Sequence, residues 1–177
     1  MSFEEKKLGG ETVYDGKILR LEVDEVELPD GTKSRRECVR HHGGAAVFCV
    51  IDGKVLLVRQ YRYLYGKEIY EIPAGKLETG EDPLAAAKRE LEEETGYIAE
   101  KITPYITLYP TPGYTDEIIR IYKAENCRKA KQKLDEGEFL SVHAVEIGEL
   151  LQMIERGEVC DSKTVAAAYK YAFETKK

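Results

Sequence analysis

The chain has 177 residues, of which 42% are hydrophobic and 34% charged, a composition typical of a soluble globular protein long enough to build its own core. Its formal net charge of −6 argues against nucleic acid or an anionic membrane as the main partner. The first ten residues lack the apolar segment of a signal peptide, and the longest unbroken apolar run, AAVFCVI, is too short to cross a membrane. We therefore expect a cytoplasmic protein that binds neither nucleic acid nor a membrane.

The first part of the chain is predicted to form two β-hairpins. ILRLEVDEVEL alternates apolar and polar residues, PDGT turns the chain, and KSRRECVRH returns. AAVFCVID and KVLLVRQYRY then form a second hairpin of more apolar character, and IYEIPAG is a short strand that enters a Pro-Gly loop. This pattern predicts a small N-terminal β unit (residues 1–42) ahead of the rest of the chain (residues 43–177).

A helix is predicted from Asp82 to about Thr95, because Asp82 suits an N-cap, Pro83 the first helical position and Gly96 the C-terminal end. Three strand-like segments follow, ITPYITLY, EIIRIYKAE and EFLSVHAVE, with the charged loop KAKQKLDEGE before the third. Two more helices are expected, one around GELLQMIERG and one from Asp161 through YKYAFE. The four cysteines are widely spaced without a C-x-x-C pair, which predicts buried free thiols rather than zinc or disulfides. The fold class is therefore α+β.

The helix sequence KRELEEETGY (residues 88–97) places carboxylates on one face. At 100° per residue, Glu90, Glu93 and Glu94 share a face, whereas Leu91 lies on a second stripe that can pack on a sheet. Like charges at this spacing repel one another. Either the face is simply solvated, or a hard divalent cation such as Mg²⁺ or Mn²⁺ relieves the repulsion.

The spacing from Gly75 to Tyr97 is G-x5-E-x7-R-E-L-x-E-E-x-G-Y. It resembles the Nudix box of the Nudix hydrolases, G-x5-E-x7-R-E-U-x-E-E-x-G-U with U a bulky aliphatic residue, and departs from it at Tyr97. The resemblance implies an α/β/α sandwich with a mixed sheet, here preceded by a small N-terminal antiparallel sheet. It also implies hydrolysis of a nucleoside diphosphate linked to another moiety.

The resemblance assigns metal ligands within and before the box. Glu90 and Glu94 are the main helix ligands, and the backbone carbonyl of Ala74 adds a further one. The expected ion is Mg²⁺, with Mn²⁺ as a substitute. Glu93 is a candidate catalytic residue, either as another ligand or held by Arg89. Glu81 is expected to fasten the loop to the helix.

Two segments outside the box are similar to the ADP-ribose pyrophosphatases of this family. Pro112 lies 15 residues beyond Tyr97, the distance of that subfamily's marker proline. LDEGEF (residues 134–139) resembles its acidic loop, in which Glu136 would be the general base and Glu138 an additional metal contact. The implied reaction converts ADP-ribose and water to AMP and ribose 5-phosphate.

The same resemblance implies residues that bind the substrate. Arg36 and Arg62 would pair with phosphate oxygens, because a guanidinium fork suits phosphate geometry. Glu37 would accept a hydrogen bond from an adenine amino group or a ribose hydroxyl, and Glu71 would help to shape the pocket. The N-terminal sheet of this subfamily typically exchanges between two subunits, so a homodimer is implied, and Arg36 and Glu37 would serve the partner's site.

The identity of the substrate keeps alternatives open. The aromatic residue that stacks on adenine in some relatives has no counterpart in YDGKILRL, so Tyr14, Tyr61, Tyr63 or an aliphatic side chain would cover the base. Other candidate substrates are another nucleoside diphosphate sugar, such as a GDP-sugar, or a damaged nucleoside triphosphate. A sensor that binds ADP-ribose without cleaving it is disfavoured by the intact box and by the lack of a helix-turn-helix segment.

Overall fold

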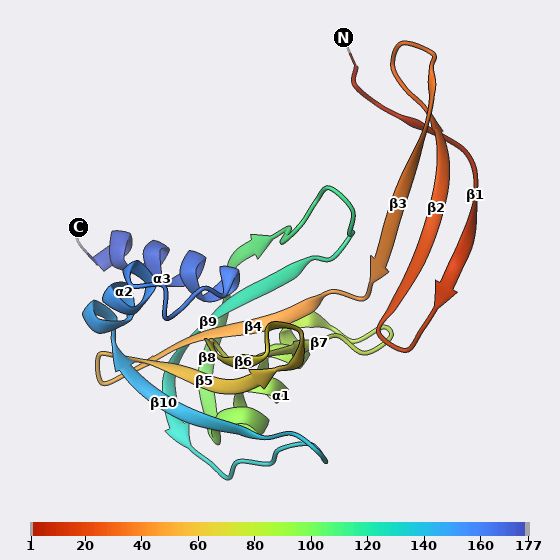
Figure 1. The fold of residues 1–177 in the computed structure, drawn as a ribbon. Coiled ribbons are helices and arrows are strands. Elements are labelled where there is room, and N and C mark those ends of the chain that lie inside the picture. The colour runs from red at the N-terminus through yellow and green to blue at the C-terminus, as the bar shows by residue number, and fades with distance from the viewer. Residues whose placement is uncertain (1, 176–177) are drawn as a thin grey trace. The chain divides into compact units, whose positions relative to one another are not determined.

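The computed structural model describes residues 2–175, shown in Figure 1. The described residues divide into two compact units. One comprises the chain up to Gly43 together with Tyr109–Ile118, and the other comprises Gly44–Leu108 and the chain from Ile119 onward. The N-terminal unit predicted from the sequence, residues 1–42, does not include the stretch 109–118, which belongs to the first unit here.

The first unit contains a three-stranded antiparallel sheet in the order β1-β2-β3, with β1 at Lys6–Asp15, β2 at Leu19–Glu27 and β3 at Lys33–His41. The hairpin of β2 and β3 confirms the prediction from sequence. Strand β1 was not predicted, because its segment KKLGGETVYD contains two glycines and almost all its side chains are exposed. The stretch 109–118 runs beside β3, where the Val39 N–H donates to the Tyr114 carbonyl at 2.7 Å and Arg40 pairs with Asp116 at 3.3 Å.

The second unit contains a seven-stranded mixed sheet in the order β10-β5-β4-β9-β8, with β6 paired to β5 and β7 to β4. Strands β4 and β9 are parallel, and the other pairs are antiparallel. The predicted hairpin of β4 and β5 is present and pairs Val50 with Val55. The strands are β4 (Gly44–Ile51), β5 (Lys54–Arg62), β6 (Lys67–Glu71), β7 (Ala74–Lys76), β8 (Tyr97–Leu108), β9 (Ile119–Lys129) and β10 (Leu140–Glu146).

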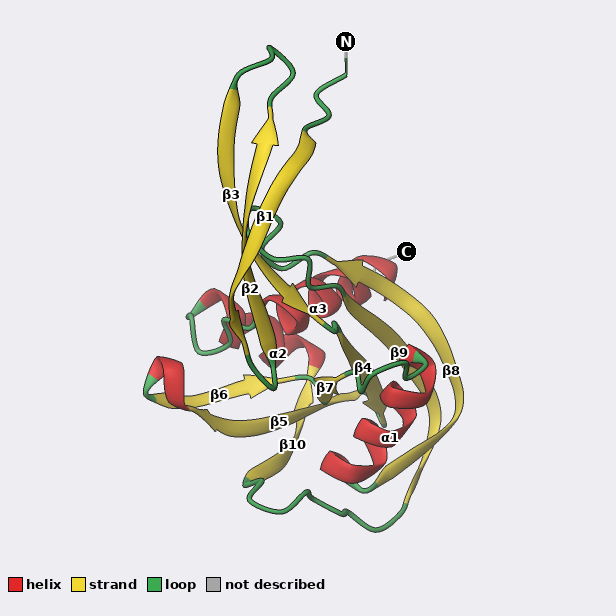
Figure 2. Cartoon of the chain, turned by 90° about the vertical axis from the view of Figure 1, so that its right-hand side faces the viewer, coloured by secondary structure: helices red, strands yellow, loops and turns green. Residues whose placement is uncertain are grey.

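Three α-helices cover the two faces of this sheet: α1 (Pro83–Thr95) on one side, and α2 (Ile147–Glu155) with α3 (Ser162–Thr175) on the other (Figure 2). A short 3₁₀ turn, η1 (Tyr63–Tyr65), joins β5 and β6. The alternation of β4 decides the layers, because successive side chains of a strand point to opposite faces. Ala46 and Phe48 join the core cluster under α2 and α3, whereas Val47 joins the cluster under α1.

All four cysteines are free thiols, as predicted, but the prediction that they are buried is wrong for most of them. Cys49 is buried, Cys38 and Cys127 are half-buried, and Cys160 is exposed on the loop before α3. The Cys49 and Cys127 sulfur atoms lie 3.0 Å apart. No helix in the described part of the chain is long and apolar enough to span a membrane.

Candidate active site

Helix α1 begins and ends where local chemistry requires. The Asp82 carboxylate accepts from the Ala85 N–H at 2.9 Å, and Pro83 is the first helical residue. Gly96 ends the helix in the left-handed region at φ 69°. The charged loop packs against this end, because the Ala130 N–H donates to the Gly96 carbonyl at 2.6 Å and the Gln132 side-chain amide donates to the Glu94 carbonyl at 2.5 Å.

Arg89 organises the acidic side of α1. Its Nε and Nη2 donate to the two Glu81 oxygens at 3.1 and 3.2 Å, while its Nη1 donates to Glu90 at 2.8 Å and Glu93 at 2.9 Å. Glu81 also accepts from the Glu78 N–H at 3.0 Å. This arrangement confirms that Glu81 fastens the loop to the helix. It also shows Glu93 held by Arg89, which is one of the two arrangements that the sequence left open.

Glu90 and Glu94 are buried carboxylates, and Glu94 is only 3% exposed. The Ala74 N–H donates to Glu94 Oε2 at 2.9 Å, so the loop before the box is tied to the helix at the residue expected to supply a carbonyl ligand. A Cβ on Gly75 would lie 1.8 Å from Glu90 Oε1. A side chain at Gly75 would therefore displace the Glu90 carboxylate, which lies directly against the Gly75 backbone.

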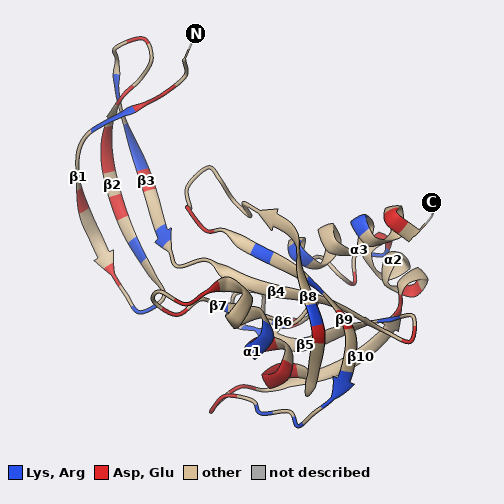
Figure 3. Ribbon diagram, turned by 180° about the vertical axis from the view of Figure 1, so that it is seen from behind, with Lys and Arg blue, Asp and Glu red and all other residues tan. Residues whose placement is uncertain are grey.

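Arg89 compensates Glu90 in part, whereas Glu94 has no cationic partner among the described residues. Burial, then the charges of Glu90 and Glu138, raise the pKa of Glu94 to about 8 against the single opposing hydrogen bond from Ala74. Burial also raises the pKa of Glu90, although Arg89 works in the opposite direction. The acidic residues of α1 are seen together in Figure 3.

The acidic loop brings Glu138 to this face. The Glu138 charge contributes to the raised pKa of both Glu90 and Glu94, and its Oε1 accepts from the Gln60 amide at 3.4 Å. Glu136, two residues earlier, is exposed, and its side chain makes no hydrogen bond or ion pair within residues 2–175.

The residues present fit a divalent cation. Residues 2–175 contain no group of three or more His, Cys, Asp or Glu side chains already gathered as metal ligands. Nevertheless, Glu90 and Glu94 are hard oxygen donors, are buried, and repel each other and Glu138, so a cation among them would remove an electrostatic cost that the protein alone does not remove. The Ala74 backbone, hydrogen-bonded to Glu94, lies next to this face.

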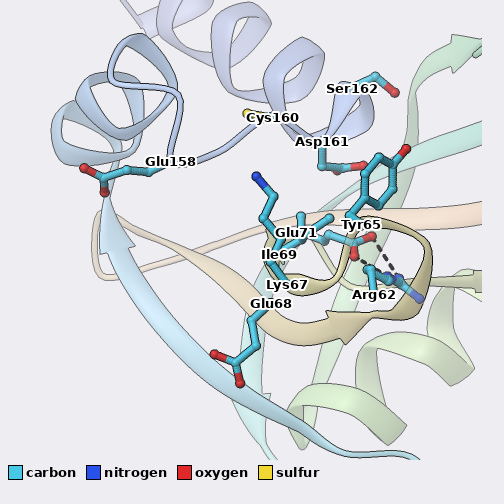
Figure 4. A pocket seen from close by; sticks show the side chains of 10 residues that line it. All are labelled: Arg62, Tyr65, Lys67, Glu68, Ile69, Glu71, Glu158, Cys160, Asp161 and Ser162. Atoms are coloured by element: carbon cyan, nitrogen blue, oxygen red, sulfur yellow. Dashed lines mark hydrogen bonds and ion pairs between the residues drawn. The ribbon is translucent and has the colours of Figure 1, made fainter.

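Arg62 and Glu71 lie together beside a cavity of about 480 Å³ lined by residues of β5, η1, β6 and the loop before α3 (Figure 4). Arg62 Nε and Nη2 donate to Glu71 Oε1 and Oε2 at 2.5 and 2.9 Å. The charge of Glu94 acts on Arg62, so this cluster lies within electrostatic range of the carboxylate face. Burial works to raise the pKa of Glu71, but the hydrogen bonds from Arg62 and the charge of Lys163 lower it overall.

Reasoning from the sequence missed Lys163 and Asp161. Lys163 Nζ contacts Glu71 Oε2 at 2.5 Å and Asp161 Oδ1 at 2.8 Å, and it is buried. One signal was available: Lys163 lies in the first turn of a helix, where a cation is disfavoured by the helix dipole unless acidic groups surround it.

Arg36 and Glu37 belong to the first unit. Arg36 pairs with Glu5 there, with distances of 2.9 and 2.6 Å from its Nε and Nη2 to the two carboxylate oxygens. Glu37 is exposed on β3, opposite Val23 of β2.

Comparison with known proteins identifies the family of this chain. The family model described as the NUDIX domain matches residues 40–167. The chain belongs to the Nudix hydrolase family. A second model, the nucleoside diphosphate sugar hydrolase N-terminal domain, matches residues 5–39, which include β1, β2 and most of β3.

Two relatives of this Nudix chain align along most of their length. The chain is 46% identical over 169 residues to the ADP-ribose pyrophosphatase of Bacillus subtilis (strain 168), which covers 94% of this chain and 91% of that protein. It is also 46% identical over 168 residues to the methanol dehydrogenase activator of Bacillus methanolicus, with coverage of 93% and 91%. The crystal structure of an ADP compounds hydrolase superposes with a TM-score of 0.87 at 21% identity, over 99% of this chain and 97% of that one. This likeness confirms the predicted Nudix fold with its N-terminal antiparallel sheet.

Proposed function

We propose that the chain is a divalent-cation-dependent ADP-ribose pyrophosphatase that releases AMP and ribose 5-phosphate, with Mg²⁺ as the ion and Mn²⁺ as a substitute. The observation that supports this most is the buried pair Glu90 and Glu94, only partly compensated by Arg89 and within electrostatic range of Arg62, which suits a cation and a pyrophosphate together. The match to a Bacillus subtilis ADP-ribose pyrophosphatase supports the choice of substrate.

The side chains have separate tasks in this reaction. Glu90, Glu94, the Ala74 carbonyl and Glu138 would hold the ion, which when bound neutralises pyrophosphate charge and orients a water. Arg62 binds a phosphate oxygen through Nη1, because its Nε and Nη2 are taken by Glu71.

Glu136 is proposed as the general base that takes a proton from the attacking water, since its exposed carboxylate is without a side-chain partner in the described chain. Glu93, held by Arg89, is the second candidate base. Glu136→Gln is expected to lower kcat far more than it raises KM. A near wild-type rate in Glu136→Gln, with the loss seen in Glu93→Gln, would transfer the role to Glu93.

We also propose a homodimer in which Arg36 and Glu37 bind ligand in the partner's site. The match of residues 5–39 to the N-terminal domain of nucleoside diphosphate sugar hydrolases supports this assignment. The cytoplasmic location stays a prediction from sequence.

Product analysis tests the function. The protein is incubated with Mg²⁺ and equal amounts of ADP-ribose, ADP-glucose, GDP-mannose and 8-oxo-dGTP, and the products are identified. AMP released fastest from ADP-ribose is the expected result. Faster cleavage of another substrate would retain the cation face and refute the choice of ADP-ribose, whereas cleavage of none would favour a sensor.

A further inference from the structure

We propose that Lys163, together with Asp161, is a positioning residue that acts through Glu71 to hold the Arg62 guanidinium in place for a substrate phosphate. The proposal rests on the proposed function, in which Arg62 binds phosphate. It extends that function to residues of the loop before α3 and its first turn, which lie about a hundred positions further along the chain.

The contacts form one continuous chain of opposite charges. Arg62 donates twice to Glu71, at 2.5 and 2.9 Å, and Lys163 donates to the same carboxylate at 2.5 Å. Both Glu71 oxygens are therefore occupied, and Oε2 is shared by the two cations. Lys163 is in turn held by Asp161 at 2.8 Å. Glu71 can keep one orientation because it is fixed from both sides.

Burial makes this geometry rigid. The Glu71 and Lys163 side chains are 7% and 10% exposed, whereas the Arg62 side chain is 42% exposed. The two inner groups are out of water and must satisfy each other, since a buried charge without a partner is strongly unfavourable. Arg62 is the outer member, with part of its guanidinium free to meet a ligand. In Figure 4 the Arg62 side chain lies beside Glu71, and its guanidinium points away from Asp161.

The Asp161 end of this series of ion pairs is anchored to Thr164 and, through it, to the backbone. Asp161 Oδ2 accepts from the Thr164 N–H at 3.0 Å and from the Thr164 hydroxyl at 2.5 Å. The fully buried Thr164 hydroxyl accepts from the Ile72 N–H at 2.8 Å, directly after Glu71. The first turn of α3 thereby fixes both the Glu71 side chain and the backbone that leads to Ala74.

The consequence is a preorganised donor. With Nε and Nη2 bound to Glu71, Arg62 has Nη1 to offer and needs little further ordering when a phosphate arrives. If Lys163 is removed, Glu71 loses one of its two restraints and Arg62 becomes mobile. Phosphate binding then weakens, while the carboxylate face of α1 stays intact.

The test compares Lys163→Met, the milder Lys163→Gln, Arg62→Met and the control Lys170→Met. Lys170 suits as a control because it lies on the same helix and also loses a hydrogen bond, at 2.6 Å to the Tyr105 carbonyl. We expect Lys163→Met to raise KM for ADP-ribose about tenfold, the ratio for one charge-assisted hydrogen bond, with a much smaller change in kcat. Lys163→Gln, which keeps a donor, should fall between it and the wild type. Lys170→Met should lower thermal stability without changing KM.

A second readout does not require turnover. In ¹⁵N NMR spectra the Arg62 Nε–H signal, assigned by its loss in Arg62→Met, should exchange slowly with water in the wild type and in Lys170→Met. It should exchange fast or vanish in Lys163→Met, or in Lys163→Gln if the methionine variant does not fold.

Three outcomes would overturn the proposal: an unchanged Arg62 signal in the Lys163 variants, an unchanged KM in them while Arg62→Met raises KM, or an Arg62→Met variant with wild-type KM. If the wild type cleaves no substrate, the proposed function fails. The NMR comparison then still decides whether Lys163 positions Arg62.

Discussion

Two groups of buried carboxylates lie within electrostatic range of each other, and their pKa values are shifted in opposite directions. On α1, burial and neighbouring negative charges raise the pKa of Glu94 to about 8. The second group consists of Glu71 with Arg62 and Lys163. Glu71 is also buried, but the two cations lower its pKa. The first group lacks enough positive charge of its own, whereas the second is neutralised by the protein. The balance of charge around a buried carboxylate, and not its burial, separates a site for an external cation from a structural ion-pair cluster.

The largest expected effect comes from Glu94→Gln. Loss of a ligand to the cation should reduce kcat on the order of 10³-fold, because several kcal/mol of charge stabilisation are lost. The metal-free variant should be at least as stable as the wild type at neutral pH, since Gln can still accept from Ala74 and avoids the cost of keeping a proton on a buried carboxyl. Turnover and thermal unfolding in EDTA measure the two effects. Addition of Mg²⁺ should raise the unfolding temperature of the wild type alone. Wild-type activity in this variant would refute the cation face.

The pH dependence of metal-free stability should separate the two groups. The folded Glu94 holds its proton up to about pH 8, whereas the unfolded carboxyl loses it near its ordinary value of 4.5. The free energy of unfolding should therefore fall by a few kcal/mol as pH rises across this window.

Glu71 should change the stability with pH in the opposite direction to Glu94, because the pKa of Glu71 is lowered on folding. Its stabilisation is present above pH 4.5 and is lost as pH falls through the lowered value. Urea titrations of the wild type and Glu94→Gln between pH 4 and 8 provide the measurement. If the free energy of unfolding of Glu94→Gln falls with rising pH as much as that of the wild type, groups other than Glu94 cause the pH dependence.

Glu71→Gln should destabilise the protein by about 2 kcal/mol, since it leaves the buried Lys163 and the partly buried Arg62 short of one negative charge. Chemical denaturation measures this loss. This change in stability is opposite in direction to the one expected for Glu94→Gln in EDTA. If both variants gain stability, the second group is not neutralised as the contacts indicate.

Glu92→Gln is expected to have the smallest effect. Glu92 lies on the same helix but pairs with exposed Lys133 at 3.6 Å, and such surface pairs contribute less than about 1 kcal/mol. kcat, KM and thermal stability should all stay near wild type. A large loss of activity would mean that the carboxylates of α1 do not act according to the face on which they lie.

The fold and the core of the candidate site were predictable because their signals are local. The cap at Asp82, the end at Gly96 and the spacing of the box place α1 and its carboxylates within a few residues. Strand β1 was not predictable, since an exposed strand with two glycines shows no apolar alternation.

Contacts between distant segments were not predictable either. Lys163 meets Glu71 across 92 positions, and no local pattern encodes that pairing. The approach of Glu138 to α1 depends on how the charged loop packs on the helix end through Gln132, which its polar composition does not specify.

The anchoring of Glu71 by Lys163 and Thr164 has a consequence for the order in which the protein is made. Arg62, Glu71 and the whole of α1 leave the ribosome well before residues 161–164. A nascent chain can thus complete the sheet and the carboxylate helix while Arg62, which we propose binds phosphate, still lacks its support. Each molecule acquires a finished substrate site only when α3 has emerged and packed, so a truncated product keeps the family's signature box without a properly held arginine.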